Sequence, residues 1–449
     1  MMRLCPAATG QRRKSRPIHS EGITMKMKAI LAAAALTLTL VGTAPAYAAD
    51  SVTLNFYHTQ LPFMQPILEG FKKAHPEITI NDQAPAANYS AGDQSVIRGM
   101  MTGSAPDVYL ASYSSLPTIA GVMKDRGEAQ SLDPMLAKEG NDWQTANYAP
   151  AILDLAKVRG EQYAMPFTAS LPLLYVNKEL VEKAGGNVDR FPTTWDGVID
   201  LAAKISKLGN GVQGIGFSVG GLSDDWYWQM MVMGAGDQML DAKNSGIGYD
   251  DKAGLEALRI AQDMAVKTGM SVYADPKPAQ QQFFAGKIGM VVESPSDLVA
   301  YETAIGDRFT MRTVRFPLID AKKGGLPAGG NALMVLAKDA AKRAAAWEFV
   351  KYMTSAAVQA EVSKASGYMP VNVQTAKTLE GFYAEHPNFQ TVFKSMNAAM
   401  PWFAYPNNTA DDVWKGVAPI LDQLQRGKIT PEAAMPKIRE HVAGVMAAQ

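Results

Sequence analysis

The sequence predicts an α/β protein of two lobes, each a mostly parallel sheet flanked by helices. Residues 52–80 show the pattern of a strand, a helix and a strand, an order that favours a parallel sheet with a crossover helix. A chain of 449 residues is also too long for one compact core. No long linker interrupts it, so we expect the chain to cross between the lobes several times.

Alternation of apolar and polar residues predicts the first elements. Val52, Leu54 and Phe56 alternate with polar neighbours, which is typical of a strand. The elements expected next are a helix that ends at Pro76, a strand at 78–80, a helix over 93–101 and a buried strand over 107–111.

The second half of the chain continues this alternation. Thr193 or Thr194 can cap a helix that runs toward Gly209, because a hydroxyl accepts a free N–H at a helix start and glycine suits its end. The further elements expected are a helix over 255–268, a strand over 288–292, and helices over 338–355, 413–424 and 431–446. The glycine pairs at 324–325 and 329–330 are candidate crossings between the lobes.

The N-terminal segment has the features of an export signal. Residues 25–48 combine a basic start, an apolar run at 29–41 and the small residues Ala46 and Ala48 at a cleavage site. The run is shorter than the ~20 residues that a membrane-spanning helix needs. Residues 1–24 are interpreted as an extension from a start codon placed too far upstream. We therefore expect a periplasmic protein.

The charge of the mature chain argues against nucleic acid and membrane partners. The sequence has 43 Lys and Arg and 43 Asp and Glu, and residues 1–48 hold seven of the former and one of the latter. The remaining chain is acidic by about six charges, whereas nucleic acid and anionic membranes attract basic patches. The single cysteine, Cys5, lies before the cleavage site, so neither a disulfide nor a lipid anchor is expected.

An enzyme hypothesis rests on Ser218. Residues 216–220 match the G-x-S-x-G pattern of a hydrolase nucleophile. The preceding strand is interrupted by glycine, and only His386 and His441 follow the serine as potential bases. We interpret this segment as a loop that enters a helix.

No metal or cofactor is expected. The mature chain has four histidines without paired spacing, and it has no cysteine. Asp250 and Asp251 lack the alternating carboxylates of a calcium loop. No phosphate-binding loop or dinucleotide fingerprint appears.

Aromatic and small polar residues gather in the predicted loops. Sugars offer flat C–H faces that pack on rings, and their hydroxyls need polar partners. Only one of Trp226 and Trp228 is expected to face a ligand, since two residues are about 200° apart around a helix. The candidate ligand-binding residues are Tyr89, Tyr113, Trp226, Trp228, Gly330, Asn331, Tyr368 and Trp402.

Five short phrases add a resemblance to a known family. They begin at Gly103, Pro166, Pro192, Phe283 and Gly367. In this order they resemble the extracellular solute-binding proteins of ABC importers. The resemblance implies the two-lobed periplasmic binding protein fold (type II) with a hinge that the chain crosses several times. It implies one lobe from 50–170 and 328–377 and another from 171–327 and 378–449.

Within this family, the chain resembles the members that bind glycerol 3-phosphate. Their ligand residues correspond here to Tyr89, Ser170, Ser294, Gly329, Gly330 and Tyr368. Two positions depart from the pattern, because Tyr113 replaces a carboxylate and Asn407 replaces an arginine. A phosphate needs a cation, so these changes favour a neutral sugar or oligosaccharide. Glycerol phosphate stays open if Arg98 or Lys415 reaches the site.

The resemblance also implies the partners. The protein would be a monomer that closes on its ligand, docks on the membrane subunits of an ABC permease and performs no catalysis. The sequence does not tell which sugar or which permease is involved.

Overall fold

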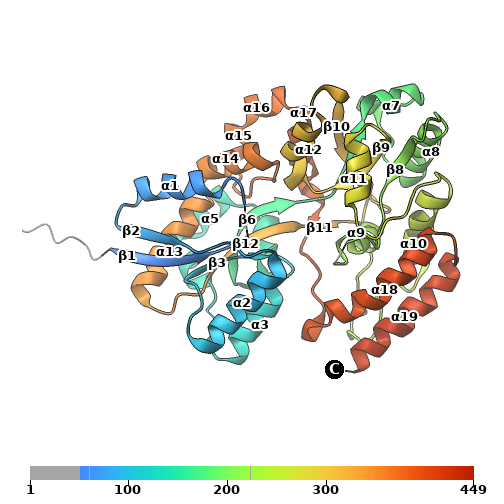
Figure 1. The fold of residues 1–449 in the computed structure, drawn as a ribbon. Coiled ribbons are helices and arrows are strands. Elements are labelled where there is room, and N and C mark those ends of the chain that lie inside the picture. The colour runs from blue at the N-terminus through green and yellow to red at the C-terminus, as the bar shows by residue number, and fades with distance from the viewer. Residues whose placement is uncertain (1–50, 60, 129, 223, 449) are drawn as a thin grey trace, which may run out of the picture. The chain divides into compact units, whose positions relative to one another are not determined.

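The computed structural model describes residues 51–448 apart from residues 60, 129 and 223 (Figure 1). The predicted extension at 1–24 and signal peptide at 25–48 lie outside these residues. Residues Ala49–Gln449 form one compact unit. This unit contains two main sheets, each flanked by helices, as expected for a two-lobed α/β protein.

The two sheets take their strands from separate parts of the chain. The first sheet has the order β2 (Ile78–Asp82), β1 (Val52–Tyr57), β3 (Val108–Ser112), β12 (Gly329–Val335) and β6 (Ala164–Ser170). The second has the order β10 (Met311–Arg315), β7 (Leu173–Asn177), β9 (Ile288–Glu293) and β8 (Gln213–Gly216). We call the parts built on them the first and second lobes. Two small sheets pair β4 (Lys157–Val158) with β5 (Glu161–Gln162) and β11 (Leu326–Pro327) with β13 (Ala399–Met400).

The sheets are mixed rather than mostly parallel. In the first sheet β1 runs parallel to β2 and β3, but β12 runs antiparallel to both β3 and β6. In the second sheet only β8 and β9 are parallel. The reason is the crossing between lobes: β12 returns from the other lobe and enters the first sheet from its opposite end.

The helices agree with the segments expected from periodicity, with shifted ends. The helix expected over 93–101 begins at Tyr89, because the Asn88 side chain accepts a hydrogen bond from the Ala91 N–H at 2.9 Å. Thr194 caps the helix that begins at Trp195, with 3.3 Å between its hydroxyl and the Gly197 N–H.

The helices have the following bounds. Those before β7 are α1 (Met64–Ala74), α2 (Tyr89–Thr102), α3 (Leu116–Asp125), α4 (Asp133–Glu139), α5 (Asn141–Asn147) and α6 (Pro150–Asp154). Those between β7 and β11 are α7 (Lys178–Lys183), α8 (Trp195–Ser206), α9 (Trp226–Gly234), α10 (Lys252–Val266), α11 (Lys277–Phe284) and α12 (Leu298–Ile305). Those after β12 are α13 (Ala340–Met353), α14 (Ala356–Ser366), α15 (Thr375–Thr378), α16 (Glu380–Glu385), α17 (Pro387–Ser395), α18 (Ala410–Gln425) and α19 (Pro431–Ala447).

Both faces of the first sheet are buried. Leu54, Phe56 and Leu110 belong to a core that includes residues of α1 and α13. Tyr109 and Ala111, on the other face of β3, belong to a core that includes residues of α2 and α3. A strand that is covered on both sides is continuously apolar, which explains the short apolar run before Ser112.

The chain changes sheets at two short segments. It leaves the first sheet after Ser170 and enters the second at Leu173, and it returns at Gly329. At the return, β11 pairs in parallel with β13, and the Ala328 N–H donates to the Met400 carbonyl at 2.9 Å. The exact lobe boundaries, including the one at 377–378, remain a prediction.

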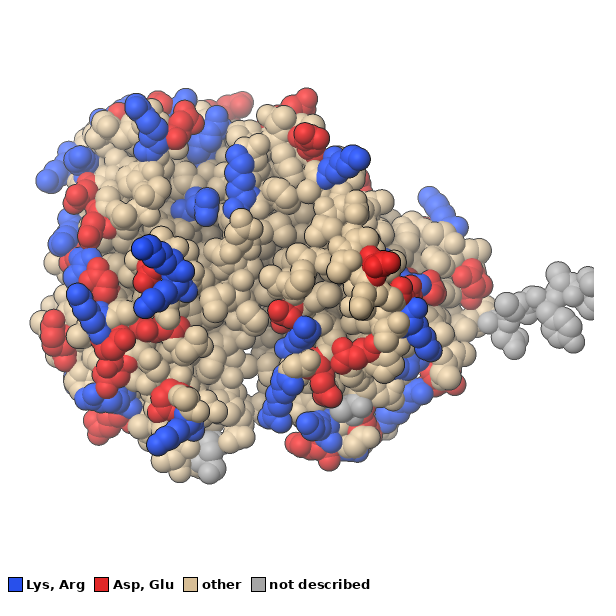
Figure 2. Space-filling model, turned by 180° about the vertical axis from the view of Figure 1, so that it is seen from behind, with Lys and Arg blue, Asp and Glu red and all other residues tan. Residues whose placement is uncertain are grey.

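The surface carries both signs of charge. Figure 2 shows Lys and Arg interspersed with Asp and Glu on this face, and the surface is indented where the two lobes meet. Among the described helices, none combines the length and apolar character needed to cross a bilayer.

Close packing of β8 on α8 provides a test of the fold. A Cβ added to Gly214 would lie 1.9 Å from the Ala202 carbonyl oxygen, so Gly214→Ala should lower the free energy of unfolding by about 1–3 kcal/mol. Gly121 in α3 has open space around it, and Gly121→Ala should instead be neutral or stabilising by up to ~1 kcal/mol. Urea unfolding of both variants measures this difference. Equal stability of the two variants would contradict the packing of β8 against α8.

Candidate functional site

A buried asparagine organises one edge of the first sheet. Because β12 runs antiparallel to β6, the start of β12 and the end of β6 lie at the same edge, where Asn331 faces Thr168. The Asn331 Oδ1 accepts from the Thr168 hydroxyl at 3.1 Å, and its Nδ2 donates to the Tyr89 hydroxyl at 3.1 Å. The Asn331 side chain is completely buried. It therefore holds Tyr89, the first residue of α2, against the sheet.

Two glycines let other groups approach this edge. Gly330 has φ near +120°, and a Cβ there would lie 2.3 Å from the Thr168 carbonyl oxygen. A Cβ on Gly329 would lie 2.9 Å from the Ser170 hydroxyl and 3.4 Å from the Trp226 ring. A side chain at Gly330 would separate β12 from β6, so this position needs glycine. A side chain at Gly329 would require the Ser170 hydroxyl to move and would contact the indole.

Two buried tyrosines adjoin this edge. Tyr113 follows β3, is 3% exposed, and its hydroxyl has no hydrogen-bond partner among the described residues. Burial first, and the neighbouring Tyr368 phenol second, raise the pKa of Tyr113 above its ordinary value. Burial, with Tyr89 nearby, likewise raises the pKa of Tyr368. Both phenols are therefore neutral hydrogen-bond donors at physiological pH.

The turn that carries Tyr368 connects the two lobes. A Cβ on Gly367 would lie 2.3 Å from the Pro295 carbonyl oxygen and 2.7 Å from the Leu298 Cβ, so the backbones are in close contact. Gly367 ends α14, which follows the first sheet, whereas Pro295 follows β9 of the second. Residue 367 has φ near +107°, which also favours glycine.

Polar groups of the second lobe follow directly after β9. The Ser294 hydroxyl accepts from the Ser296 hydroxyl at 2.8 Å and from the Ser296 N–H at 3.2 Å. The Ser294 carbonyl accepts from the Tyr175 hydroxyl at 2.8 Å. Ser294 is half-buried, and these bonds fix its position opposite the Tyr368 turn.

The same region contains carboxylates without a basic partner. Glu293 is 7% exposed and accepts from Tyr301 at 2.8 Å and from Gln280 at 2.6 Å. Burial first, and the charge of Asp297 second, raise the pKa of Glu293 to about 7. Burial also raises the pKa of Asp297, and it raises that of Asp225 to about 7. None of the described Lys, Arg or His residues bonds to these three groups.

Two stacked indoles lie beside the return crossing. The rings of Trp226 and Trp402 are 6.2 Å apart and inclined by 19°. The Trp226 Nε1 donates to the Pro327 carbonyl of β11 at 2.9 Å, and Trp402 comes two residues after β13. Trp226 is 9% exposed, whereas Trp402 is half-buried and offers more ring surface to a ligand.

Two predicted ligand residues lie apart from this arrangement. Trp228 is 1% exposed, and its Nε1 donates to the Tyr249 hydroxyl at 3.1 Å, so Trp228 is a core residue and Trp226 is the member of the pair near Trp402. Asn407 is exposed in a turn with φ near +54°. Its neighbour Asn408 accepts a hydrogen bond at 2.8 Å from Thr118 of α3, so this turn touches the first lobe.

The structure adds residues that the sequence did not single out. Thr168 completes the Asn331 network, Asp297 adds to the acidic region, and Gln229 bonds to the segment that carries Trp402. Thr168 lies two residues before Ser170 in β6, so alternation along that strand could have indicated it. No local pattern indicates Gln229, because its partner lies 174 residues away.

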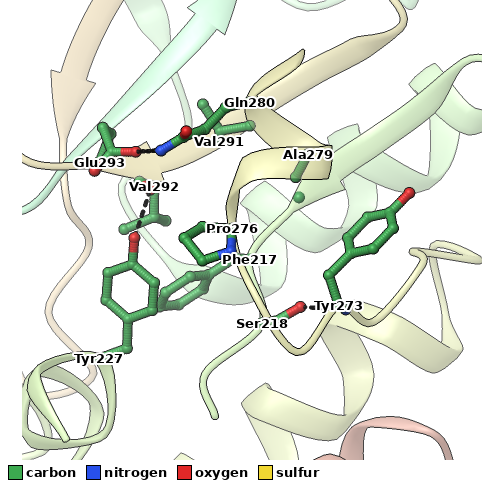
Figure 3. Close-up of a pocket in the computed structure, with 11 residues that line it drawn as sticks. Phe217, Ser218, Tyr227, Tyr273, Pro276, Ala279, Gln280, Val291, Val292 and Glu293 are labelled. Carbon is green, nitrogen blue, oxygen red and sulfur yellow. Dashed lines mark hydrogen bonds between the residues drawn. The ribbon is translucent and has the colours of Figure 1, made fainter. Parts of the chain in front are cut away.

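Neither histidine that follows Ser218 in the sequence lies at the Ser218 hydroxyl. Figure 3 shows Ser218 and Glu293 lining one cavity, with the serine hydroxyl accepting from the Tyr273 N–H at 2.9 Å. The cavity volume is about 10 Å³, which is room for one water molecule. His386 stacks on Phe382, and His441 faces carbonyls of α18. Neither supplies Ser218 with a base.

The two cations that could support a phosphate are also elsewhere. Arg98 lies nine residues after Tyr89 in α2, which is about 14 Å along the helix axis. Lys415 is 73% exposed and pairs with Asp412 at 3.1 Å. Among the described residues, no group of three or more His, Cys, Asp or Glu is arranged to hold a metal.

The candidate ligand-binding residues that adjoin the crossing between the lobes are named together here. We call the set of Tyr89, Tyr113, Trp226, Ser294, Asn331, Tyr368 and Trp402 the interlobe site.

Comparisons with known proteins agree with this architecture. The sn-glycerol-3-phosphate-binding periplasmic protein UgpB of Agrobacterium fabrum is 24% identical over 364 residues, which are 78% of each protein. The structure of UgpB from Mycobacterium tuberculosis with glycerophosphocholine has a TM-score of 0.74 and 18% identity, over 89% of this chain and 99% of that one. The sugar-binding protein MalE from Xanthomonas citri has a TM-score of 0.75 and 18% identity, over 88% and 98%.

These likenesses confirm the two-lobed binding protein fold that the sequence predicted. Residues 57–360 match the sequence pattern of the family described as bacterial extracellular solute-binding protein, and this match covers more than half of the chain. The chain belongs to the bacterial extracellular solute-binding protein family.

Proposed function

We propose that this protein captures a neutral sugar or oligosaccharide at the interlobe site and delivers it unaltered to an ABC permease. The observation that carries the proposal is the combination of an accessible indole with neutral hydrogen-bonding groups. Trp402 offers a ring to the C–H face of a sugar, and the buried, unbonded Tyr113 hydroxyl could bond to a sugar hydroxyl once the lobes open. The two lobes would close on the ligand and open to release it.

The charge around the site supports a neutral ligand over glycerol phosphate. Glu293, Asp297 and Asp225 have no basic partner among the described residues, so this region holds no cation to compensate the charge of a phosphate. Glycerol phosphate remains the competing ligand, since relatives such as the A. fabrum protein are named for it.

The family of the protein supports the setting that we propose for it. Export by the predicted signal peptide at 25–48 would place it in the periplasm, where it would act as a monomer on the membrane subunits of its importer. A hydrolase that uses Ser218 is disfavoured, because the adjoining cavity cannot hold a substrate.

Thermal unfolding should distinguish the ligand classes. A ligand at ~100 times its Kd adds about 2.7 kcal/mol to the stability of the folded state. We expect the melting temperature to rise with one or more neutral saccharides from a panel that contains maltose, maltotriose, trehalose and raffinose. We expect no rise with sn-glycerol 3-phosphate or glycerophosphocholine. A rise with either phosphate ester alone would overturn the sugar assignment.

The unpaired Tyr113 hydroxyl provides a direct test of the site. Tyr113→Phe removes no hydrogen bond within the protein, so stability should be unchanged or higher, whereas ligand affinity should fall about tenfold. Tyr148→Phe is the matched control, because the Tyr148 hydroxyl bonds to Thr354 at 2.7 Å. The control should lose stability and keep its affinity. Calorimetric titration with the saccharide found by thermal shift measures the affinity of both variants. Unchanged affinity in Tyr113→Phe would remove Tyr113 from the site.

The buried carboxyl of Glu293 should make stability depend on pH. Its pKa is about 7 in the folded protein and near 4.5 when unfolded, so the folded state holds the extra proton between these values. Stability should therefore fall as pH rises from about 4.5 to about 7, by up to the order of 3 kcal/mol. Glu293→Gln should flatten this fall. Urea unfolding at pH 4.5, 6, 7 and 8 measures it, and parallel curves for both proteins would contradict the raised pKa.

A further inference from the structure

A buried glutamine in α9 bonds to a distant segment. Gln229 is completely buried, and its Nε2 donates to the Phe403 carbonyl at 3.0 Å. Its Oε1 accepts from the Phe403 N–H at 3.1 Å. The side-chain amide of Gln229 thus bonds to both the N–H and the carbonyl of the Phe403 backbone. The Nε2 also donates to Asp225 Oδ1 at 3.0 Å. One side chain thus joins the first turn of α9 to the segment after β13.

This contact lies beside both indoles of the interlobe site. Trp402 directly precedes Phe403, and Trp226 lies three residues before Gln229 in α9. Residues three apart occupy the same face of a helix, so the face that carries Trp226 also holds the Trp402 segment. The Trp226 Nε1 is itself fixed to the Pro327 carbonyl. One indole is therefore held by its own N–H and the other through the backbone of the next residue.

Glutamine suits this position because it donates and accepts at once. An apolar side chain would leave the half-buried N–H and carbonyl of Phe403 without this partner, at a cost in stability. A glutamate would lack the N–H donors and would place a second negative charge next to Asp225. Either change would allow the segment after β13, which contains Trp402 and Phe403, to take other positions.

We propose that Gln229 is a positioning residue for ligand selection, which sets the ring of Trp402 against Trp226 and so fixes the aromatic surface that a sugar meets. This inference rests on the proposed function, since it needs Trp402 to contact the ligand. Gln229 itself is completely buried, so it would act through Trp402 and not by direct contact with the ligand.

A double-mutant cycle tests the inference. Gln229→Met keeps the approximate length of the side chain and removes its polar groups. In the otherwise unchanged protein it should weaken binding of the saccharide found by thermal shift about tenfold. In a Trp402→Ala background it should have little further effect, because both changes remove the same surface. Full additivity of the two effects would overturn the inference.

A ligand-free measurement separates this inference from the proposed function. Two indoles stacked at 6.2 Å should give a near-ultraviolet circular dichroism band that disappears in Trp402→Phe. Gln229→Met should remove the same band and make tryptophan emission more accessible to acrylamide. If the band persists unchanged, the inference fails even though sugars bind. If no saccharide binds the normal protein, the proposed function fails, and with it the role in ligand selection.

Another buried glutamine provides the matched control. Gln425 is 1% exposed, accepts from the Val219 N–H at 2.9 Å and donates to the Phe217 carbonyl at 3.1 Å. It joins two backbone segments of the same lobe in the same way, but neither carries Trp402. Gln425→Met should lose a similar amount of stability and keep both the dichroism band and the affinity. Equal changes in both glutamine variants would indicate a general loss of packing and would reject a specific role for Gln229.

Discussion

The parallel pairing of β11 with β13 holds together the parts of this protein that meet between the lobes. Each strand has only two residues, yet the pair fixes two segments that lie more than 70 residues apart in the chain. Pro327 of β11 accepts the Trp226 N–H, and β12 with its glycines begins two residues later. Trp402 likewise lies two residues after the end of β13. The aromatic part of the interlobe site is therefore attached to the segment at which the chain crosses between the lobes.

This attachment has consequences for ligand capture. A ligand shifts an equilibrium between open and closed forms only by the difference in its affinity for them. Because the indoles adjoin the crossing while Tyr368 and Ser294 come from different lobes, closure would bring rings and hydroxyls to the ligand together. The bond between Thr118 and Asn408 joins the lobes at another point. Contacts within the protein therefore also join the lobes, apart from any that a ligand would add.

The proposed neutral ligand agrees with the buried polar groups of this region. Asn331 satisfies its buried polar groups with Tyr89 and Thr168, whereas Glu293 and Asp225 are buried without cations and keep their protons more readily. A ligand that brought its own negative charge would need a cation that neither Arg98 nor Lys415 supplies.

The sequence by itself determined the fold class, the succession of elements and the family. These follow from local information: alternation in β1, the amphipathic α1, the cap at Thr194 and the ordered short phrases. Tyr89, Asn331, Tyr368 and Trp402 were indicated because polar and aromatic residues in turns are locally visible. Only the tertiary structure decided that Trp228 is a core residue while Trp226 meets Trp402, that the sheets are mixed, and that Gln229 bonds to Phe403. Each of these depends on segments that are distant in the chain, and local periodicity carries no information about which distant segments pair.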